Sequence, residues 1–374
     1  MIDQTESLEK AGKLENTGPP GPSGQAEPAD ERPDGAPDDG RRPTIDSVAS
    51  AAAVSRQTVS NVINAPHRVG EQTRRRVERA IAEAGYRPLK TAQALRTRRS
   101  NLIAVGIPNA GGTRNLLIEG FLHVLTEEAQ RRGYRILLVT GTDDESEIRA
   151  YNDLLTDYDI DALVFTATHR GDQRIPWLLD KGTRFVTFGR PWGTKAAHPW
   201  VDVDGAGGVR EATEHLIELG HQRIAFIGWP GGSGVGEDRL SGWEQACRTA
   251  GLPRRDLSRR TQDGLEQGRQ ACASLLDSPK PPTAIVCVSD TLAVGAWVEV
   301  TARGGRPGRD VAIIGFDDSP TASMIGLSSV AQPLAAAAAV CVDCVQSFNR
   351  TTGTSTTAPL QVLLAPKLIV RESG

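Results

Sequence analysis

The chain has 374 residues and a mass of 40.0 kDa, which is enough for two or three domains with separate cores. Hydrophobic residues make up 39% and charged residues 24%, as in a soluble globular protein. No stretch approaches the roughly 20 apolar residues of a membrane-spanning helix, so no membrane partner is expected. The first residues, MIDQTESLEK, are acidic and polar and do not predict a signal peptide.

The formal net charge of −3 by itself argues against a nucleic-acid partner, but the charge is unevenly distributed. Residues 1–40 carry a net charge of −7, residues 41–100 carry +9, and residues 101–374 carry −5. A basic module of about sixty residues therefore lies between an acidic tail and a mildly acidic body. This asymmetry indicates nucleic-acid binding.

Taken in chain order, residues 1–43 are rich in Pro, Gly, Asp and Glu, and we expect them to be a disordered acidic tail. Three short helices are predicted next, with Thr44 and Ser55 as N-caps of the first two and Gly85 ending the third. They cover residues 44–52, 55–64 and 71–84, within a domain that spans 44–88, and a short amphipathic hinge helix and linker follow at 89–100.

From residue 101 onward, short apolar runs alternate with helical segments. Continuous apolar runs of this length are typical of strands buried on both faces, and the alternation predicts α/β architecture with parallel sheets. About 270 residues are too many for one open sheet, so we expect two lobes. Lobe 1 is predicted at about 101–200 and 334–350, and lobe 2 at about 201–330 and 351–374. The predicted strands are 102–108, 135–140, 162–167, 184–189, 223–228, 283–288 and 311–316, with ligands expected at the loops after them.

Residues 44–64 have the proportions of a helix-turn-helix, whose second helix enters the major groove of DNA. A three-helix bundle with a polar face would give the same helical pattern, so both interpretations stay open on the pattern alone. Side chains expected to be exposed on the second helix are Arg56, Gln57, Thr58, Ser60, Asn61 and Asn64. Residue types suited to phosphates are Thr44, Ser55, Thr58, Ser60 and Arg68.

The basic module contains the motifs TIDSVASAAAVSRQTVSNVIN, RVGEQTRRRVERAIAEAGYRP and AQALRTRR. Through these motifs it closely resembles the DNA-binding domain and hinge of the LacI/GalR (lactose repressor) family. The resemblance continues through GHQRIAFIG, SDTLAVGA, IIGFDDSP and SSVAQP and covers about residues 44–372. It implies a homodimeric, ligand-controlled transcription factor with a periplasmic-binding-protein-like core.

The resemblance also implies roles for individual residues. Arg56 and Gln57 match the two main base-reading positions, and Thr58, Ser60 and Asn61 match further groove and backbone contacts. Leu95 matches the hinge leucine that wedges between bases in the minor groove, with Ala92 packed beside it.

The chain also departs from the family pattern. Asn61 stands where Arg is usual, which leaves detailed base preference open. Ala53 replaces a common Gly of the turn, Leu89 a common Asn, and Gly70 a common capping Ser.

Effector binding is predicted from the tryptophans and from the resemblance. All six Trp lie between residues 177 and 297, and indole faces suit the apolar faces of sugar rings. For Trp192, Trp229 and Trp243, cleft and core positions are equally open, whereas Trp177 and Trp297 are expected in the core.

The family match adds Arg210, Asp290 and Trp243 as ligand contacts, with Arg190 and Arg239 as weaker candidates. A salt bridge or helix cap is the alternative for Arg210 and Asp290. The aromatic pair common after the first strand is absent from PNAGGTRN, and later Trp residues are expected to compensate.

No cofactor, metal site or catalytic constellation is expected. GGSGVGED has the wrong spacing for a phosphate loop and is predicted to be a flexible cleft loop. The five scattered Cys, including the lone pair Cys341 and Cys344, indicate core residues in a reducing cytoplasm.

The sequence therefore predicts a cytoplasmic repressor that a sugar or oligosaccharide releases from a palindromic operator. An activator, a co-repressor-dependent regulator and a sugar-binding protein without a DNA role are the alternatives, and an enzyme is not expected.

Overall fold

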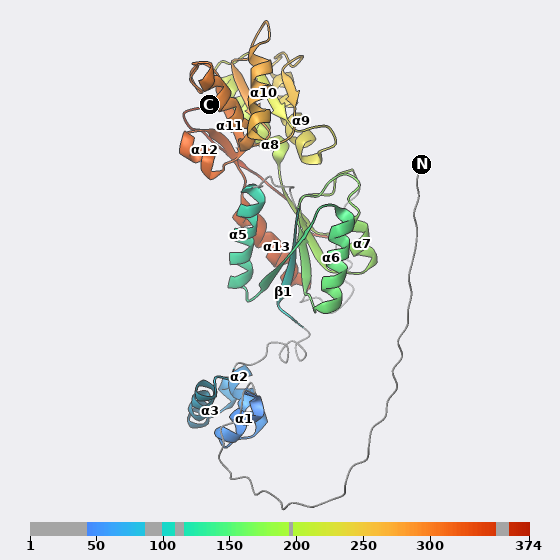
Figure 1. Cartoon of the computed structure of the whole chain (residues 1–374), viewed down its shortest axis with the longest axis vertical. Coiled ribbons are helices and arrows are strands. Elements are labelled where there is room, and N and C mark those ends of the chain that lie inside the picture. Colours follow the sequence, from blue (N-terminus) through green and yellow to red (C-terminus); the bar gives the residue numbers. More distant parts are fainter. Residues whose placement is uncertain (1–42, 87–98, 109–115, 194–196, 349–358) are drawn as a thin grey trace, which may run out of the picture. The chain divides into compact units, whose positions relative to one another are not determined.

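The fold is described from a computed structural model (Figure 1). The chain divides into two compact units, residues 1–88 and 89–374, and each is described by itself. The described residues are 43–86, 99–108, 116–193, 197–348 and 359–374.

Within its described residues, 43–86, the first unit contains three α-helices and one 3-10 helix around a small apolar core. Its elements are α1 (Ile45–Ala51), α2 (Arg56–Asn64), the short 3-10 helix η1 (Pro66–Arg68) and α3 (Glu71–Ala84). Apolar residues recur along each helix at the spacing of one helical face, which turns that face inward. The side chains buried there are Val48, Ala49, Ala52, Val59, Val62, Val77 and Ala80.

Local capping fixes the ends of these helices as predicted. Thr44 forms a capping box with Ser47, and the Ser55 hydroxyl accepts from the Thr58 amide at 3.1 Å. Gly85 ends α3 with φ of +62°, a left-handed conformation that suits glycine. Ala53, in the turn between α1 and α2, is also left-handed, with φ of +49°.

The first lobe of the second unit has a six-stranded sheet with strand order β11-β5-β4-β3-β1-β2, and every pairing is parallel. Helices α5 and α13 cover one face and α6 and α7 the other (Figure 1). The strands are β1 (Leu102–Pro108), β2 (Arg135–Gly141), β3 (Ala162–Phe165), β4 (Phe185–Phe188), β5 (Trp200–Val203) and β11 (Gln361–Leu364). The helices are α5 (Leu116–Arg131), α6 (Asp144–Asp157), α7 (Arg174–Asp180) and α13 (Leu334–Phe348).

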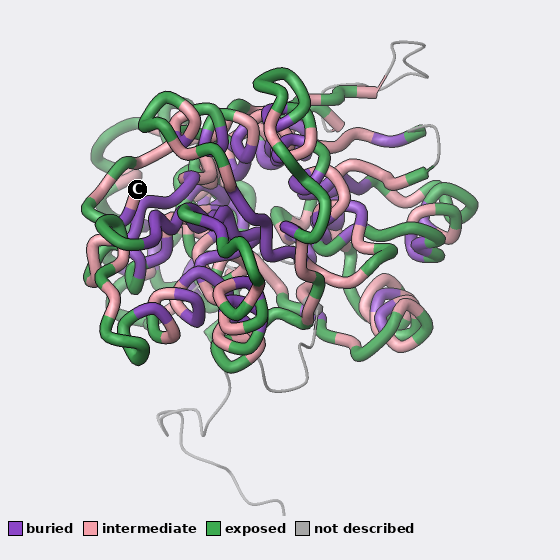
Figure 2. The backbone as a smooth tube through the Cα atoms, turned by 90° about the horizontal axis from the view of Figure 1, so that it is seen from above, coloured by how far each residue is buried: buried purple, intermediate pink, exposed green. Residues whose placement is uncertain are grey.

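The second lobe repeats this plan with strand order β12-β10-β9-β8-β6-β7, in which only the β10–β12 pairing is antiparallel. Its strands are β6 (Ile224–Gly228), β7 (Ser258–Arg260), β8 (Ala284–Cys287), β9 (Ala312–Asp317), β10 (Ser328–Ala331) and β12 (Lys367–Ile369). Its helices are α8 (Gly205–Glu218), α9 (Gly234–Thr249), α10 (Leu265–Leu276), α11 (Asp290–Ala302) and α12 (Pro320–Ile325). Figure 2 shows burial concentrated on the central strands and on the inner faces of the helices.

The mixed α/β architecture with parallel sheets is confirmed, and all seven predicted strands are present. The sequence prediction missed β5, β7, β10, β11 and β12, which have three or four residues each. They lie toward the edges of the two sheets, where a strand needs no continuous apolar run.

The chain crosses between the lobes after β5, after β10 and again between β11 and β12. The last crossing was not predicted. The assignment of residues 351–374 to lobe 2 is therefore wrong for Gln361–Leu364, because β11 pairs with β5 in the first lobe. The predicted loop GGSGVGED is likewise a short turn followed by the first residues of α9, with Ser233 as its N-cap.

Candidate functional sites

The head presents the N-terminal end of α2 to solvent. Arg56 and Gln57 are exposed at its first two positions, and Asn64 is exposed at its last. Thr58, Ser60 and Asn61 are half-buried on the same helix, and Arg68 is exposed in η1. The structure thus brings the predicted groove and phosphate residues of 55–68 onto one helix and the turn after it.

Hydrogen bonds along α2 orient the amide side chains. Gln57 Nε2 donates to Asn61 Oδ1 at 3.1 Å, and Asn64 Nδ2 donates to the Ser60 carbonyl at 2.8 Å. Arg56 lies 3.8 Å from Asp46, with both side chains largely exposed, so this ion pair holds the guanidinium only weakly. Arg56 is therefore free to move to another acceptor.

Two predicted DNA contacts, Ala92 and Leu95, lie outside the described residues, as do the hinge and the tail. Thr44 is described, and its side chain is engaged in the α1 capping box. A phosphate contact at Thr44 would compete with that cap.

The second unit has a cleft of about 380 Å³ between its two lobes. A pocket of this size that gathers apolar and polar side chains is the usual form of a small-molecule site. The first lobe contributes Leu117, Ile118, Ala167, Thr168, His169, Phe188, Gly189 and Asp202, and the second contributes Trp229, Ser233, Gly234, Val235 and Arg239, with Gln332 at a crossing between the lobes.

Trp229 presents an indole to the cleft in a fixed orientation. Its Nε1 donates to Asp263 Oδ1 at 3.0 Å, and the Ser289 hydroxyl donates to the same oxygen. Trp229 directly follows β6 in the chain and so lies at the carboxyl end of that strand, which is where ligands bind in parallel sheets. Trp229 is the predicted tryptophan whose cleft position the structure supports most directly.

Arg239 supplies a buried cation at the cleft wall. Only 3% of the residue is exposed, and its guanidinium carbon lies 3.6 Å from the centroid of the Phe316 ring. The guanidinium donates to the Val288 carbonyl and lies 3.7 Å from Asp317, while Nε has no partner. Burial, with the nearby Asp290 carboxylate, raises the pKa of Asp317 to about 7, and the Arg239 charge opposes the rise.

Arg190 joins the two lobes instead of standing free for a ligand. Its Nε donates to Asp202 at 2.6 Å, and a terminal nitrogen lies 3.2 Å from Asp238 of α9. Burial raises the pKa of Asp238, and the Arg190 charge opposes that rise. The Arg190 guanidinium also lies over the Trp192 ring, at 4.8 Å from its centroid. That ring packs against Gly234 at the start of α9, so Trp192 too is an inter-lobe contact.

Of the predicted effector contacts, Trp229 and Arg239 are in the cleft lining. Arg190 and Trp192 lie at the lobe contact, and Trp243, Arg210 and Asp290 lie elsewhere. Trp243 is 1% exposed, stacks on Phe226 and donates to the Ile224 carbonyl at 3.2 Å, so it belongs to the second core. Trp243 lies one turn after Arg239 on the same helical face, and that extra turn places it over β6 instead of the cleft.

Arg210 and Asp290 depart from the prediction in different ways. The Arg210 side chain is 41% exposed on α8, 3.9 Å from Glu214, because the buried face of α8 runs through other positions. Asp290 is 3% exposed and accepts from the Ser319 amide and the Ser329 hydroxyl, both at 2.6 Å. Burial raises the pKa of Asp290. Its carboxylate links the starts of α11 and α12, as in the helix-cap alternative.

Sequence reasoning missed several cleft residues and ranked Arg239 too low. Thr168, Phe188 and Gly189 directly follow or end predicted strands, so the rule that ligands bind at strand ends would have found them. Ser233 lies in GGSGVGED, the segment predicted at the cleft, whereas no sequence signal pointed to Gln332, which reaches the cleft through the packing of the lobes.

Among the residues that the structure describes, one group has side chains of metal-ligand types close together: Asp144, His169 and Asp172 have ligand atoms within 4.8 Å of one another. The buried Arg174 guanidinium already occupies these carboxylates, at 2.7 Å from Asp172 and 3.6 Å from Asp144. Because a cation at this position would be repelled by Arg174, the cluster fits a structural ion network better than a metal site.

A helix-turn-helix head joined to a two-lobed core with a ligand cleft defines a class of protein, the effector-controlled DNA-binding regulator. Residues 44–88 match the family "Bacterial regulatory proteins, lacI family", and residues 213–374 match "Periplasmic binding protein-like domain". The chain is 35% identical to the HTH-type transcriptional regulator CelR of Thermobifida fusca, across 89% of this chain and 99% of CelR. The chain belongs to the lacI family of bacterial transcriptional regulators.

Solved structures agree with this assignment. The transcriptional regulator CelR–cellobiose complex is similar at 32% identity and a TM-score of 0.65, covering 89% of this chain and all of that one. The Lac repressor dimer bound to operator and the anti-inducer ONPF is similar at 25% identity and a TM-score of 0.77, covering 89% and 99%. In the described part of this chain, every helix is too short or too polar to cross a membrane.

Proposed function

We propose that this protein is a homodimeric repressor that binds a palindromic operator and is released by a sugar or glycoside bound between its lobes. The observation that carries the proposal is the cleft, in which the Trp229 ring and the buried Arg239 cation face the carboxylate of Asp202 across the two lobes. A DNA-binding repressor of this kind acts in the bacterial cytoplasm, where the chromosome lies.

At the operator, the exposed Arg56 and Gln57 read base edges, because their side chains make paired hydrogen bonds to guanine and adenine. Ser60, Asn61 and Asn64 contact bases or backbone farther along α2, and Ser55, Thr58 and Arg68 position the helix on phosphates. Leu95, with Ala92 beside it, is proposed to wedge into the minor groove at the centre of the site.

The cleft chemistry suits a polyhydroxylated ring. The Trp229 face accepts the apolar side of a sugar, Arg239 Nε offers a buried donor without a partner, and Asp202 offers acceptors. Sugar hydroxyls need both donors and acceptors, and Thr168 and Gln332 add further groups of both kinds. Because cellobiose occupies the similar CelR, it is the first effector to test.

Contacts between the lobes give a physical route from effector to DNA. Arg190 bonds Asp202 and Asp238, and the cleft ligand would bridge the same two lobes. A ligand that favours one lobe arrangement shifts the population of that arrangement, and operator must weaken the ligand as much as the ligand weakens operator.

The test selects operator DNA from a random duplex pool with the full-length protein and then titrates it with and without cellobiose and a panel of glycosides. Palindromic enrichment and release by a glycoside support the proposal, whereas tightening supports the co-repressor alternative. Absence of any sequence enrichment would refute DNA recognition altogether.

Arg56→Ala and Gln57→Ala should each cost about 1–3 kcal/mol of discrimination at one base pair. Arg255→Ala, at a 95% exposed side chain of the second lobe, is the matched control.

A further inference from the structure

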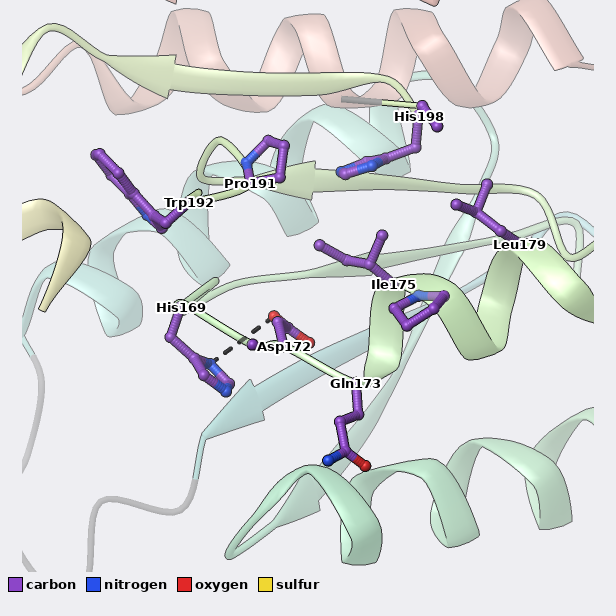
Figure 3. Close-up of a pocket in the computed structure, with 11 residues that line it drawn as sticks. His169, Asp172, Gln173, Ile175, Leu179, Pro191, Trp192 and His198 are labelled. Carbon is purple, nitrogen blue, oxygen red and sulfur yellow. Dashed lines mark ion pairs between the residues drawn. The ribbon is translucent and has the colours of Figure 1, made fainter. Parts of the chain in front are cut away.

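A second hollow of about 390 Å³ lies within the first lobe, beside the cleft (Figure 3). It is formed by the segment after β3, the first turns of α7, and the segment after β4. One wall is apolar and consists of Ile175, Pro176 and Leu179 of α7, with Pro191 facing them. Leu179 is 42% exposed, so this apolar wall opens to solvent.

His198 closes the hollow and carries an acceptor that nothing satisfies. The residue is 1% exposed, its ring stacks on Phe185, and Figure 3 shows the imidazole extending toward Pro191 above Ile175. Its Nδ1 has no hydrogen-bond partner. A buried polar atom without a partner is costly, so its retention here calls for an explanation.

The neighbouring hydrogen bonds assign the proton on the ring. Thr187 Oγ1 donates its only proton to the Gly189 carbonyl at 2.6 Å, so it accepts from His198 Nε2 at 3.1 Å. Burial lowers the pKa of His198 to about 4, so the imidazole is neutral near pH 7. The lone pair of Nδ1 is therefore free to accept a hydrogen bond from a ligand.

We propose that this hollow is a second ligand site, which binds a small neutral ring compound with a hydroxyl group, such as a phenol or a cyclic alcohol. The ring packs on Ile175, Pro176 and Leu179, and the hydroxyl donates to His198 Nδ1. The other side of the hollow carries His169, Asp172 and Gln173, and Asp172 is already paired with Arg174, so the apolar wall is where the ring packs.

The site is separate from the cleft but adjacent to it. His169 borders both, and Trp192, which lines the hollow, packs against Gly234 of the second lobe. The same ring chemistry could come from a free phenol or from the aglycone of a glycoside held in the cleft. An occupant of either origin would contact Trp192 and would thereby affect the contact between Trp192 and Gly234 that joins the two lobes.

The experiment titrates the full-length protein with phenol and with anisole, which has the same ring but no hydroxyl proton. Phenol should bind about fivefold more tightly than anisole, the effect expected of one net hydrogen bond. In His198→Phe, which keeps an aromatic ring against Phe185 but has no acceptor in place of Nδ1, the two compounds should bind equally. Imidazole nitrogen NMR of the wild type should show the Nδ1 resonance of His198 moving on addition of phenol.

A second variant keeps the test valid if His198→Phe fails to fold. Leu179→Glu should weaken phenol binding about tenfold, because a carboxylate replaces the apolar wall. Leu219→Glu, at a leucine that is 57% exposed on the second lobe, should leave phenol binding unchanged. Equal binding of phenol and anisole to the wild type, or an Nδ1 resonance that does not respond, would overturn the proposal and leave a water as the partner of Nδ1.

Trp229→Ala distinguishes the two sources and separates this proposal from the proposed function. If the variant loses its response to cleft sugars but binds free phenol as the wild type does, the hollow is an independent site. If it binds neither, the two regions form one site and the claim of a separate site fails.

Discussion

Gly234→Ala tests whether the Trp192–Gly234 contact holds the two lobes in their observed arrangement. Gly234 is the first residue of α9 in the second lobe, and Trp192 follows β4 of the first. A methyl carbon at residue 234 would stand 2.7 Å from Trp192 Cε2 and closer still to Cγ and Cδ2 of the ring. Carbon atoms in contact normally stay about 3.5–4.0 Å apart, so either the indole or the whole lobe must move by about 1 Å.

The expected cost follows from packing. Forcing an extra carbon into a close-packed contact typically destabilises by about 1–3 kcal/mol, against a small gain from the better helix propensity of alanine. Gly231→Ala is the matched control in the same segment, because its added carbon would meet only Arg260, at an ordinary 3.7 Å. We expect this control to be neutral or slightly stabilising.

A double-mutant cycle with Trp192→Ala isolates the contact. The free energy of unfolding of the core, from urea titration, should fall by about 1–3 kcal/mol in Gly234→Ala and recover most of that loss when the indole is also removed. Effector affinity should change in parallel if the lobe contact controls the cleft. Additive effects of the two substitutions would show that Trp192 and Gly234 do not meet in solution, and the inter-lobe argument would then fail.

Further predictions concern the head, the tail and the cleft. Ala53→Gly should stabilise the head, because φ of +49° strains alanine but not glycine. The free energy of opening of the head amides, measured by hydrogen exchange, should rise by about 0.5–1 kcal/mol. The control Ala51→Gly should lower it by a similar amount, because residue 51 is helical in α1 and glycine disfavours a helix. Deleting residues 1–40, with their charge of −7, should strengthen non-specific DNA binding in anisotropy titrations, and weaker binding would contradict a passive acidic tail. Burial raises the pKa of Asp317 to about 7, so the folded state retains a proton that the unfolded chain has lost above about pH 4. The free energy of unfolding should therefore fall as pH rises from about 4 to 7 and level off above that. In urea titrations at several pH values, Asp317→Asn should remove this dependence of the free energy of unfolding on pH. If the dependence is unchanged in the variant, Asp317 is not the group responsible.

The elements of the head follow from local sequence alone. Thr44, Ser55 and Gly85 act within one turn of their own helices, so the caps and the ends of α1, α2 and α3 could be predicted to within a residue or so. The exposed face of α2, with Arg56 and Gln57, follows from the same helical period. The buried strands were predictable for a similar reason, since each is a continuous apolar run.

The cleft depended on tertiary structure. Strand ends gave its approximate position, but the packing of α9 between the two lobes decided that Arg239 lines the cleft while Trp243, one turn later on the same face, is in the core. Family resemblance could not decide between the roles open to Arg210 and Asp290, because a cation or a carboxylate serves a ligand, a salt bridge or a helix cap equally well.

By itself, the sequence determined what depends on neighbours a few residues apart: caps, helical faces, apolar strands and the basic head hidden in a net charge of −3. Only the tertiary structure decided what depends on residues far apart in the chain: the third crossing at β11, the Arg190–Asp238 link, and the unpartnered nitrogen of His198. Partner choice at such distances is set by how sheets and lobes pack, and no local pattern encodes it.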